Sequence, residues 1–217
     1  MSSTAHEWDT AATAVADHAD TLTTAHTHRE IRAWAEEHGL ISPSMWTKIR
    51  TELRKQHDID YDQLRAATLR RESSEVAAAA ADAPTVVLCV AGDAEIGTYA
   101  ICPPHNDHES WYGTFHPKDK TYKAGDDQSA ELSAAQKAVF LAGKLREHLD
   151  VPALGVTILT THPDLAAEDI TADAVRARVA VTVEHVEENP AVALVRAPGY
   201  RQWREIKLPN LLGGYTT

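Results

Sequence analysis

Residues 129–149 read Ser-Ala-Glu-Leu-Ser-Ala-Ala-Gln-Lys-Ala-Val-Phe-Leu-Ala-Gly-Lys-Leu-Arg-Glu-His-Leu, and this stretch decides the fold of the second half of the chain. Apolar residues recur in it every three to four positions, which is typical of a helix that packs one face against a core. These residues are Leu132, Ala135, Val139, Ala142 and Leu145. We therefore expect a long helix here, packed across a sheet.

The segments on either side of this helix have the pattern of buried strands. Residues 85–90 form a short β-branched run that is bounded by Pro84 and Gly92, as expected for a strand in a core. Similar runs predict further strands at 97–102, 109–115, 155–160, 180–186 and 191–196, with a shorter helix at 163–179. The order predicts an α/β domain with a mixed sheet, in which three antiparallel strands precede the crossovers.

The first 71 residues have helical patterns instead. We expect residues 1–27 to form an N-terminal arm, or one helix with Trp8, Val15 and Leu22 on a single stripe. Residues 28–71 predict a small helical module.

Capping signals and aromatic residues support this helical module. Thr27 and Glu30 form a capping-box pattern, and Pro43 suits the first turn of a second helix. Trp34 and Trp46 are expected in the core of the module. An Ala-rich linker at 72–84, either a flexible tether or a helical, semi-rigid spacer, would then join the module to an α/β domain at 85–217.

Composition limits the classes of function. The net charge of −11 argues against a protein that coats nucleic acid without selectivity. Residues 28–72, with nine basic and eight acidic side chains, are the least unfavourable place for a polyanion. No apolar run approaches the roughly 20 residues of a membrane span, and the first residues lack a signal-peptide pattern. We expect a cytoplasmic protein that does not enter a membrane.

Residues 84–200 resemble the ribonuclease H-like fold. The element order is similar, and residues 129–135, Ser-Ala-Glu-Leu-Ser-Ala-Ala, look like the Ala-Glu-Leu signature that opens the first helix of that family. The resemblance implies that Glu131 is a ligand of Mg²⁺ or Mn²⁺. It also implies an Asp at the end of the first strand, where this chain has Ala91 with Asp93 two residues later. The Asp implied at the end of the fourth strand is Thr160 here, and Asp164 lies further on.

These departures favour a degenerate site. Two-metal hydrolysis needs several carboxylates around the ions, and only Glu131 matches the family residue by residue. The first hypothesis is therefore a non-catalytic pseudoenzyme that needs no cofactor and binds nucleic acid. The alternative is a divergent Mg²⁺- or Mn²⁺-dependent nuclease in which Asp93, Glu131 and Asp164 are catalytic, with Glu131 and Asp93 as metal ligands. Without function, these residues would be helix-terminus or turn carboxylates.

The helical module has a second resemblance. Residues 31–40, Ile-Arg-Ala-Trp-Ala-Glu-Glu-His-Gly-Leu, look like the first helix of the DNA-binding domain of actinobacterial nucleoid-associated silencers. The Arg-Gly-Arg hook that this resemblance implies is replaced by Pro43-Ser44-Met45-Trp46. Phosphate contacts need only charge and reach, so we expect a solvent-facing set that contacts nucleic acid: Lys48, Arg50, Arg54 and Lys55. A protein–protein interaction factor is the remaining alternative.

Overall fold

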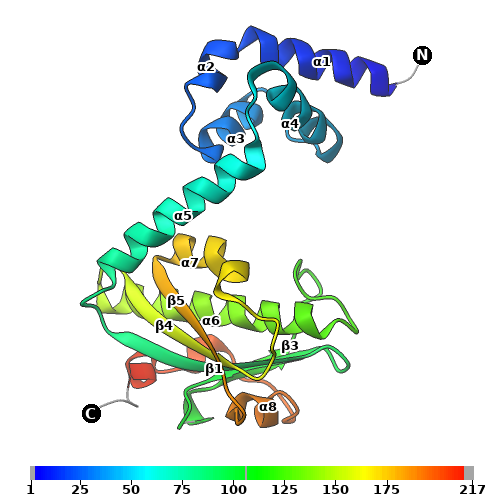
Figure 1. Cartoon of the computed structure of the whole chain (residues 1–217). Helices are drawn as coiled ribbons and strands as arrows, with labels where there is room; N and C mark the ends of the chain where they lie inside the picture. The colour runs from blue at the N-terminus through cyan, green and yellow to red at the C-terminus, as the bar shows by residue number, and fades with distance from the viewer. Residues whose placement is uncertain (1–2, 106, 213–217) are drawn as a thin grey trace. The chain divides into compact units, whose positions relative to one another are not determined.

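The chain forms two compact units. The computed structural model describes residues 3–105 and 107–212, and the division between the units falls between Arg71 and Glu72, inside helix α5 (Tyr61–Ala79) (Figure 1). The first unit is helical, and the second contains a five-stranded sheet with helices on both of its faces.

The helical unit begins earlier than the sequence predicted. Helices α1 (Ser3–Asp17) and α2 (Ala19–Thr23) precede α3 (His28–Glu37) and α4 (Pro43–His57), and the first turns of α5 complete the unit. Ala11, Val15 and Leu22 are buried with the apolar residues of α3 and α4. The expected arm is therefore corrected: its described residues form two helices. Val15 and Leu22 of the predicted stripe lie in the core of this unit, whereas Trp8 is exposed.

The predicted capping residues fix the starts of α3 and α4. The Thr27 hydroxyl accepts a hydrogen bond from the Glu30 backbone N–H (3.3 Å), and the Glu30 carboxylate accepts one from the Thr27 N–H (3.2 Å). At the next start, the Ser42 hydroxyl accepts from the Met45 N–H, with Pro43 in the first turn. Trp34 is buried as predicted, whereas Trp46 is half-buried at the edge of the core.

The Ala-rich segment is not a separate linker. Helix α5 continues through it to Ala79, as the high helix propensity of alanine favours. Val76 and Ala80 are buried in a small cluster with Ala153 and Ala180. The segment 72–80 therefore belongs to the second unit through its own apolar contacts.

The sheet of the second unit is mixed, as predicted. Its strands are β1 (Thr85–Asp93), β2 (Thr98–Cys102), β3 (Trp111–Thr114), β4 (Leu154–Thr160) and β5 (Val179–His185), in the spatial order β3-β2-β1-β4-β5. The first three strands pair antiparallel, whereas β4 pairs parallel with both β1 and β5. The expected order of three antiparallel strands followed by crossovers is confirmed.

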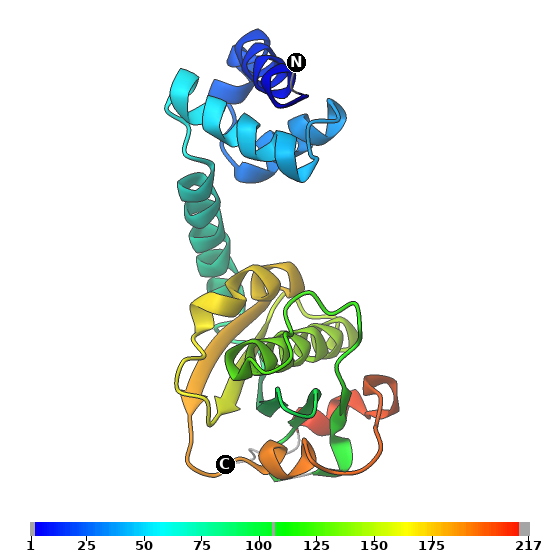
Figure 2. The ribbon, with the colours of Figure 1, turned by 90° about the vertical axis from the view of Figure 1, so that its right-hand side faces the viewer.

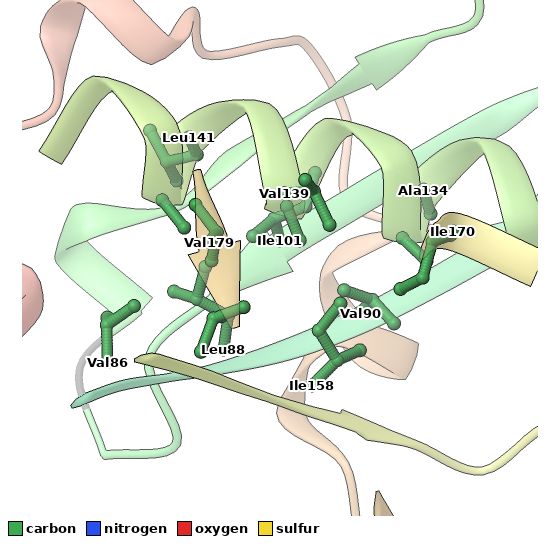
Figure 3. Close-up of a cluster of buried hydrophobic side chains, with 14 of the residues drawn as sticks. Val86, Leu88, Val90, Ile101, Ala134, Val139, Leu141, Ile158, Ile170 and Val179 are labelled. Carbon is green, nitrogen blue, oxygen red and sulfur yellow. The ribbon is translucent and has the colours of Figure 1, made fainter. Parts of the chain in front are cut away.

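Helices cover both faces of this sheet. Helix α6 (Asp127–Leu149) and helix α7 (Thr171–Ala177) lie on one face, and α8 (Pro190–Leu194) lies on the other (Figures 1 and 2). The larger core lies under α6, where side chains from the helix meet those of the strands (Figure 3). The smaller core, under α8, is built on small residues that include Cys89, Ala91, Ala100 and Cys102.

Two elements of the second unit differ from the prediction. Residues 191–196 were expected as a strand, but they belong to α8 and the turn after it, because the Asn189 side chain accepts from the Ala191 N–H and Pro190 occupies the first turn. The helix expected at 163–179 begins later, as the 3₁₀ turn η2 (Ala167–Ile170) followed by α7. Three further 3₁₀ turns are η1 (Asp107–Glu109), η3 (Trp203–Glu205) and η4 (Leu208–Leu212).

The burial of Trp34 predicts the stability of the helical unit. Trp34→Ala should lower its free energy of unfolding by about 3–5 kcal/mol, because the side chain is 5% exposed and its removal leaves a cavity. Urea unfolding followed by far-UV circular dichroism measures this. Trp8→Ala is the control, because Trp8 is 36% exposed and should cost less than half as much. Equal costs for the two variants would contradict the assignment of Trp34 to the core.

Candidate functional site

The N-terminal part of α6 lies directly on strand β1 at Gly92. A Cβ atom at Gly92 would lie 2.3 Å from the Ala130 carbonyl carbon and 2.7 Å from the Glu131 backbone nitrogen, closer than real Cβ contacts allow. Only glycine lets the helix and the strand approach this closely. This approach places Glu131 against the end of β1.

Both oxygens of the Glu131 carboxylate accept hydrogen bonds from the protein. The Gly92 backbone N–H donates to Oε2 (2.8 Å) and the Thr160 hydroxyl donates to Oε1 (2.5 Å). The side chain is buried, and this burial raises the pKa of Glu131 above its ordinary value, while the bonds from Thr160 and Gly92 oppose the rise. Glu131 therefore joins α6 to the ends of two neighbouring parallel strands, β1 and β4.

Thr160 extends this arrangement to the loop after β4. Its hydroxyl oxygen accepts from the His162 backbone N–H (2.9 Å) while its hydrogen is donated to Glu131. The position at which the resemblance implied a metal-binding Asp thus holds a neutral donor. A hydroxyl that donates to the carboxylate supports it without adding the negative charge that a divalent cation requires.

Asp93 is bound to a different set of partners. Its Oδ1 accepts from the backbone N–H groups of Glu95 and Ile96, which forms the turn between β1 and β2. Its Oδ2 accepts from the Arg196 guanidinium at 3.0 Å. Burial alone would raise the pKa of Asp93, but these donors outweigh it and hold the pKa below its usual value.

Asp164, the third predicted carboxylate, does not form a metal-binding group with Glu131 and Asp93. It is exposed in the loop after β4, where its N–H donates to the His162 ring at 3.4 Å. Within residues 3–105 and 107–212, no group of three or more His, Cys, Asp or Glu side chains is arranged to hold a metal ion. The structure brings Glu131 to Gly92 and Thr160, and Asp93 to Arg196.

The four basic residues predicted to contact nucleic acid differ in exposure. Lys48 is 7% exposed, because its ammonium donates to Glu7 (2.8 Å) and to Ser44 (2.8 Å). The expectation that Lys48 faces solvent is therefore wrong: the residue connects α4 to α1. Arg54 and Lys55 are exposed, and Arg50 is half-buried beside Asp62.

These residues border a groove in the helical unit. It has a volume of about 560 Å³ and lies between α4 and the start of α5. Arg50, Arg54 and Lys55 line it together with hydroxyl groups and two carboxylates, those of Thr47, Thr51, Tyr61, Asp60 and Asp62. Arg54 lies 3.7 Å from Asp60, and Lys55 lies 2.9 Å from Glu52. The wall is therefore rich in guanidinium and hydroxyl donors, with acidic partners beside them.

Aromatic rings lie beside this groove, and sequence reasoning did not assign them to it. The Arg32 guanidinium lies 4.9 Å from the centroid of the Trp46 ring, and the Arg50 guanidinium lies 5.5 Å from that of Tyr61. Trp46 and Tyr61 meet edge to face at 4.9 Å. The available signal was the position of Trp46 two residues before Lys48. No sequence spacing links α3, α4 and α5 at this point.

A second polar cluster was also missed. The Lys137 ammonium and the Ser133 hydroxyl both donate to Asp119 Oδ2, at 2.6 and 2.7 Å. Burial would raise the pKa of Asp119, but these donors hold it well below its usual range. The sequence did indicate that Ser133 and Lys137 are neighbours, because residues four positions apart lie on the same face of a helix. Because the ammonium is paired with a carboxylate, the cluster anchors the loop before α6 and does not supply a neutral base.

Comparison of the chain with models of protein families, with curated proteins and with solved structures finds no match. Among the helices that the structure describes, none combines the length and the apolar character that crossing a bilayer requires.

The Glu131 contacts predict a pH dependence of stability. Because its pKa is higher in the folded than in the unfolded chain, Glu131 contributes stability that is fully present below the unfolded pKa of about 4.3. This contribution is lost as the pH rises through the folded pKa. Glu131→Gln cannot ionise, so its free energy of unfolding should increase relative to wild type between pH 4 and pH 8, as measured by urea unfolding.

Glu131→Ala is the matched comparison for this measurement. It leaves the Thr160 hydroxyl and the Gly92 N–H without their acceptor, which should cost about 1–3 kcal/mol at low pH and less as the pH rises and wild type loses the Glu131 contribution. If Glu131→Gln lost as much stability as Glu131→Ala at pH 7, the ionised carboxylate itself would be required for the fold.

Proposed function

We propose that this chain is a non-catalytic nucleic-acid-binding protein, whose α/β unit is a ribonuclease H-like domain with a degenerate active site. The fold assignment is supported by the element order β-β-β-α-β-α-β and by the three antiparallel strands that precede the parallel crossovers. It is further supported by the position of Glu131 near the start of the first long helix of that unit.

The proposal that the domain is non-catalytic rests on the burial of Glu131 and on its hydrogen bonds to Gly92 and Thr160. Two-metal hydrolysis requires several carboxylates that neutralise the phosphate and activate a water molecule. Here the one carboxylate that matches the family has both oxygens bound by Gly92 and Thr160 and is 4% exposed. Among the described residues, no group of three or more His, Cys, Asp or Glu side chains is arranged around it to hold a metal ion.

The choice of nucleic acid as partner is supported by the groove of the helical unit. Arg54 and Lys55 present exposed cations along α4, and these suit phosphate contacts, which require charge and reach more than shape. Trp46 and Tyr61 are half-buried with the Arg32 and Arg50 guanidinium groups over their rings, and stacked cations and aromatic rings of this kind suit contacts with unpaired bases. This combination favours single strands or loops over a duplex.

The first test concerns hydrolysis. Purified full-length protein with Mg²⁺ or Mn²⁺ should leave RNA–DNA hybrids and single strands intact, because the carboxylates do not form a metal-binding group. Gel assays of labelled substrates measure this, with Glu131→Gln and Asp93→Asn prepared in parallel. Cleavage that depends on metal and is lost in both variants would establish the nuclease alternative.

The second test concerns the groove. The double variant Arg54→Ala/Lys55→Ala should weaken binding to single-stranded nucleic acid and reduce the slope of log K against log salt by roughly one to two units. Fluorescence anisotropy at several salt concentrations measures both quantities. Lys48 is excluded from this variant, because its removal would disturb the contact of α4 with α1.

The control for this variant is Lys118→Ala/Lys120→Ala, which removes two exposed lysines from the loop after β3. It should leave affinity and slope unchanged. A loss in the control alone would move the interface to the α/β unit. Binding that does not respond to salt, or no binding at any salt concentration, would favour a protein partner for the groove.

A further inference from the structure

Two histidines of the helical unit are in ring contact, although 20 positions separate them in the sequence. His18 lies between α1 and α2, and His38 follows the last turn of α3. Their ring centroids are 4.5 Å apart, with the planes inclined at 71°. Both rings also contact Trp34, at centroid distances of 5.5 and 5.4 Å. His38 is exposed and His18 is half-buried, so solvent reaches the pair.

The backbone fixes the same tautomer in both rings. The His18 Nδ1 lies 2.9 Å from the Ala14 carbonyl oxygen, and the His38 Nδ1 lies 2.8 Å from the Trp34 carbonyl oxygen. A carbonyl oxygen only accepts hydrogen bonds, so each Nδ1 carries the hydrogen and donates it. In the neutral ring, the lone pair is then on Nε2. Two adjacent imidazoles therefore hold their metal-binding nitrogen unprotonated when they are neutral.

We propose that His18 and His38 form a binding site for a divalent transition-metal ion of the Cu²⁺, Ni²⁺ or Zn²⁺ class. Imidazole nitrogen is a preferred ligand for these ions. A ligating histidine almost always donates its other ring N–H to a carbonyl, carboxylate or water, which sets the tautomer and orients the ring. Both rings have this second interaction in place, supplied by the helix backbone.

The ring separation is compatible with a shared ion. With metal–nitrogen bonds of about 2.0–2.1 Å, an ion bound by both Nε2 atoms would lie roughly 3 Å from each ring centroid, and the two centroids are 4.5 Å apart. In the described residues no third His, Cys, Asp or Glu completes a group with the pair, so water fills the other positions.

The experiment is a titration of the full-length protein with Ni²⁺ and, separately, Cu²⁺ in a buffer that does not chelate metals. Calorimetry should give one saturable site per chain, with Cu²⁺ bound more tightly than Ni²⁺. NMR spectra of ¹⁵N-labelled histidine, recorded with Zn²⁺ as a diamagnetic probe, should show that the Nε2 resonances of His18 and His38 shift together.

Asparagine variants separate metal binding from folding. In His18→Asn and His38→Asn, the side-chain amide nitrogen takes the place of Nδ1, which keeps the hydrogen bond to the backbone carbonyl and removes the Nε2 ligand. Each variant should keep the helical circular dichroism of wild type and bind Ni²⁺ roughly tenfold more weakly or worse. His26→Asn, at an exposed histidine outside the pair, is the control and should bind like wild type.

Two results would overturn the proposal. One is the absence of a saturable one-to-one site for both ions. The other is an affinity that is unchanged in folded His18→Asn and His38→Asn, or that falls equally in His26→Asn, because the ions would then bind the histidines of the chain without regard to this pair.

Discussion

The α/β unit depends on the close contact between α6 and β1 at Gly92. The Glu131 carboxylate stabilises this contact by accepting a hydrogen bond from the Gly92 N–H. The absence of a side chain at Gly92 lets the helix backbone reach the strand, and the two oxygens of Glu131 then bind the ends of β1 and β4. The apolar face of α6 consequently lies over the strands and forms the larger core. A buried carboxylate is costly unless donors surround it, and here the Gly92 N–H and the Thr160 hydroxyl serve as those donors.

The carboxylates near the strand ends make contacts within the unit. Both oxygens of the buried Glu131 accept hydrogen bonds, and the neighbouring Asp93 accepts from the N–H groups of its own turn and from Arg196. The Thr160 hydroxyl, at the end of β4, is one of the donors to Glu131. Glu131 therefore connects α6 to the ends of β1 and β4. Asp93 connects the end of β1 to Arg196, in the segment after α8.

The elements that the sequence predicted well are those whose signals are local. The period of α6, the β-branched runs of the strands and the capping box at Thr27 are each contained in a short window. Residues 191–196 were predicted wrongly, because their apolar pattern suits a strand equally well. The side chain of Asn189, which caps α8 and also donates to the carbonyls of Val90 and Leu159, settles the structure through contacts made 30 or more residues away.

The same distinction applies to the candidate sites. Lys48 lies on α4 among exposed basic residues, yet α1 brings Glu7 to it from 41 positions earlier and buries it. His18 and His38 have no sequence spacing that marks them as a pair, because α1 and α3 must first pack around Trp34. The sequence therefore identifies basic residues and histidines as candidates. Whether such a side chain is exposed, or paired with another, depends on the helices that pack around it. The α/β unit uses the Glu131 carboxylate for internal contacts, whereas the helical unit keeps Arg54, Lys55 and His38 exposed.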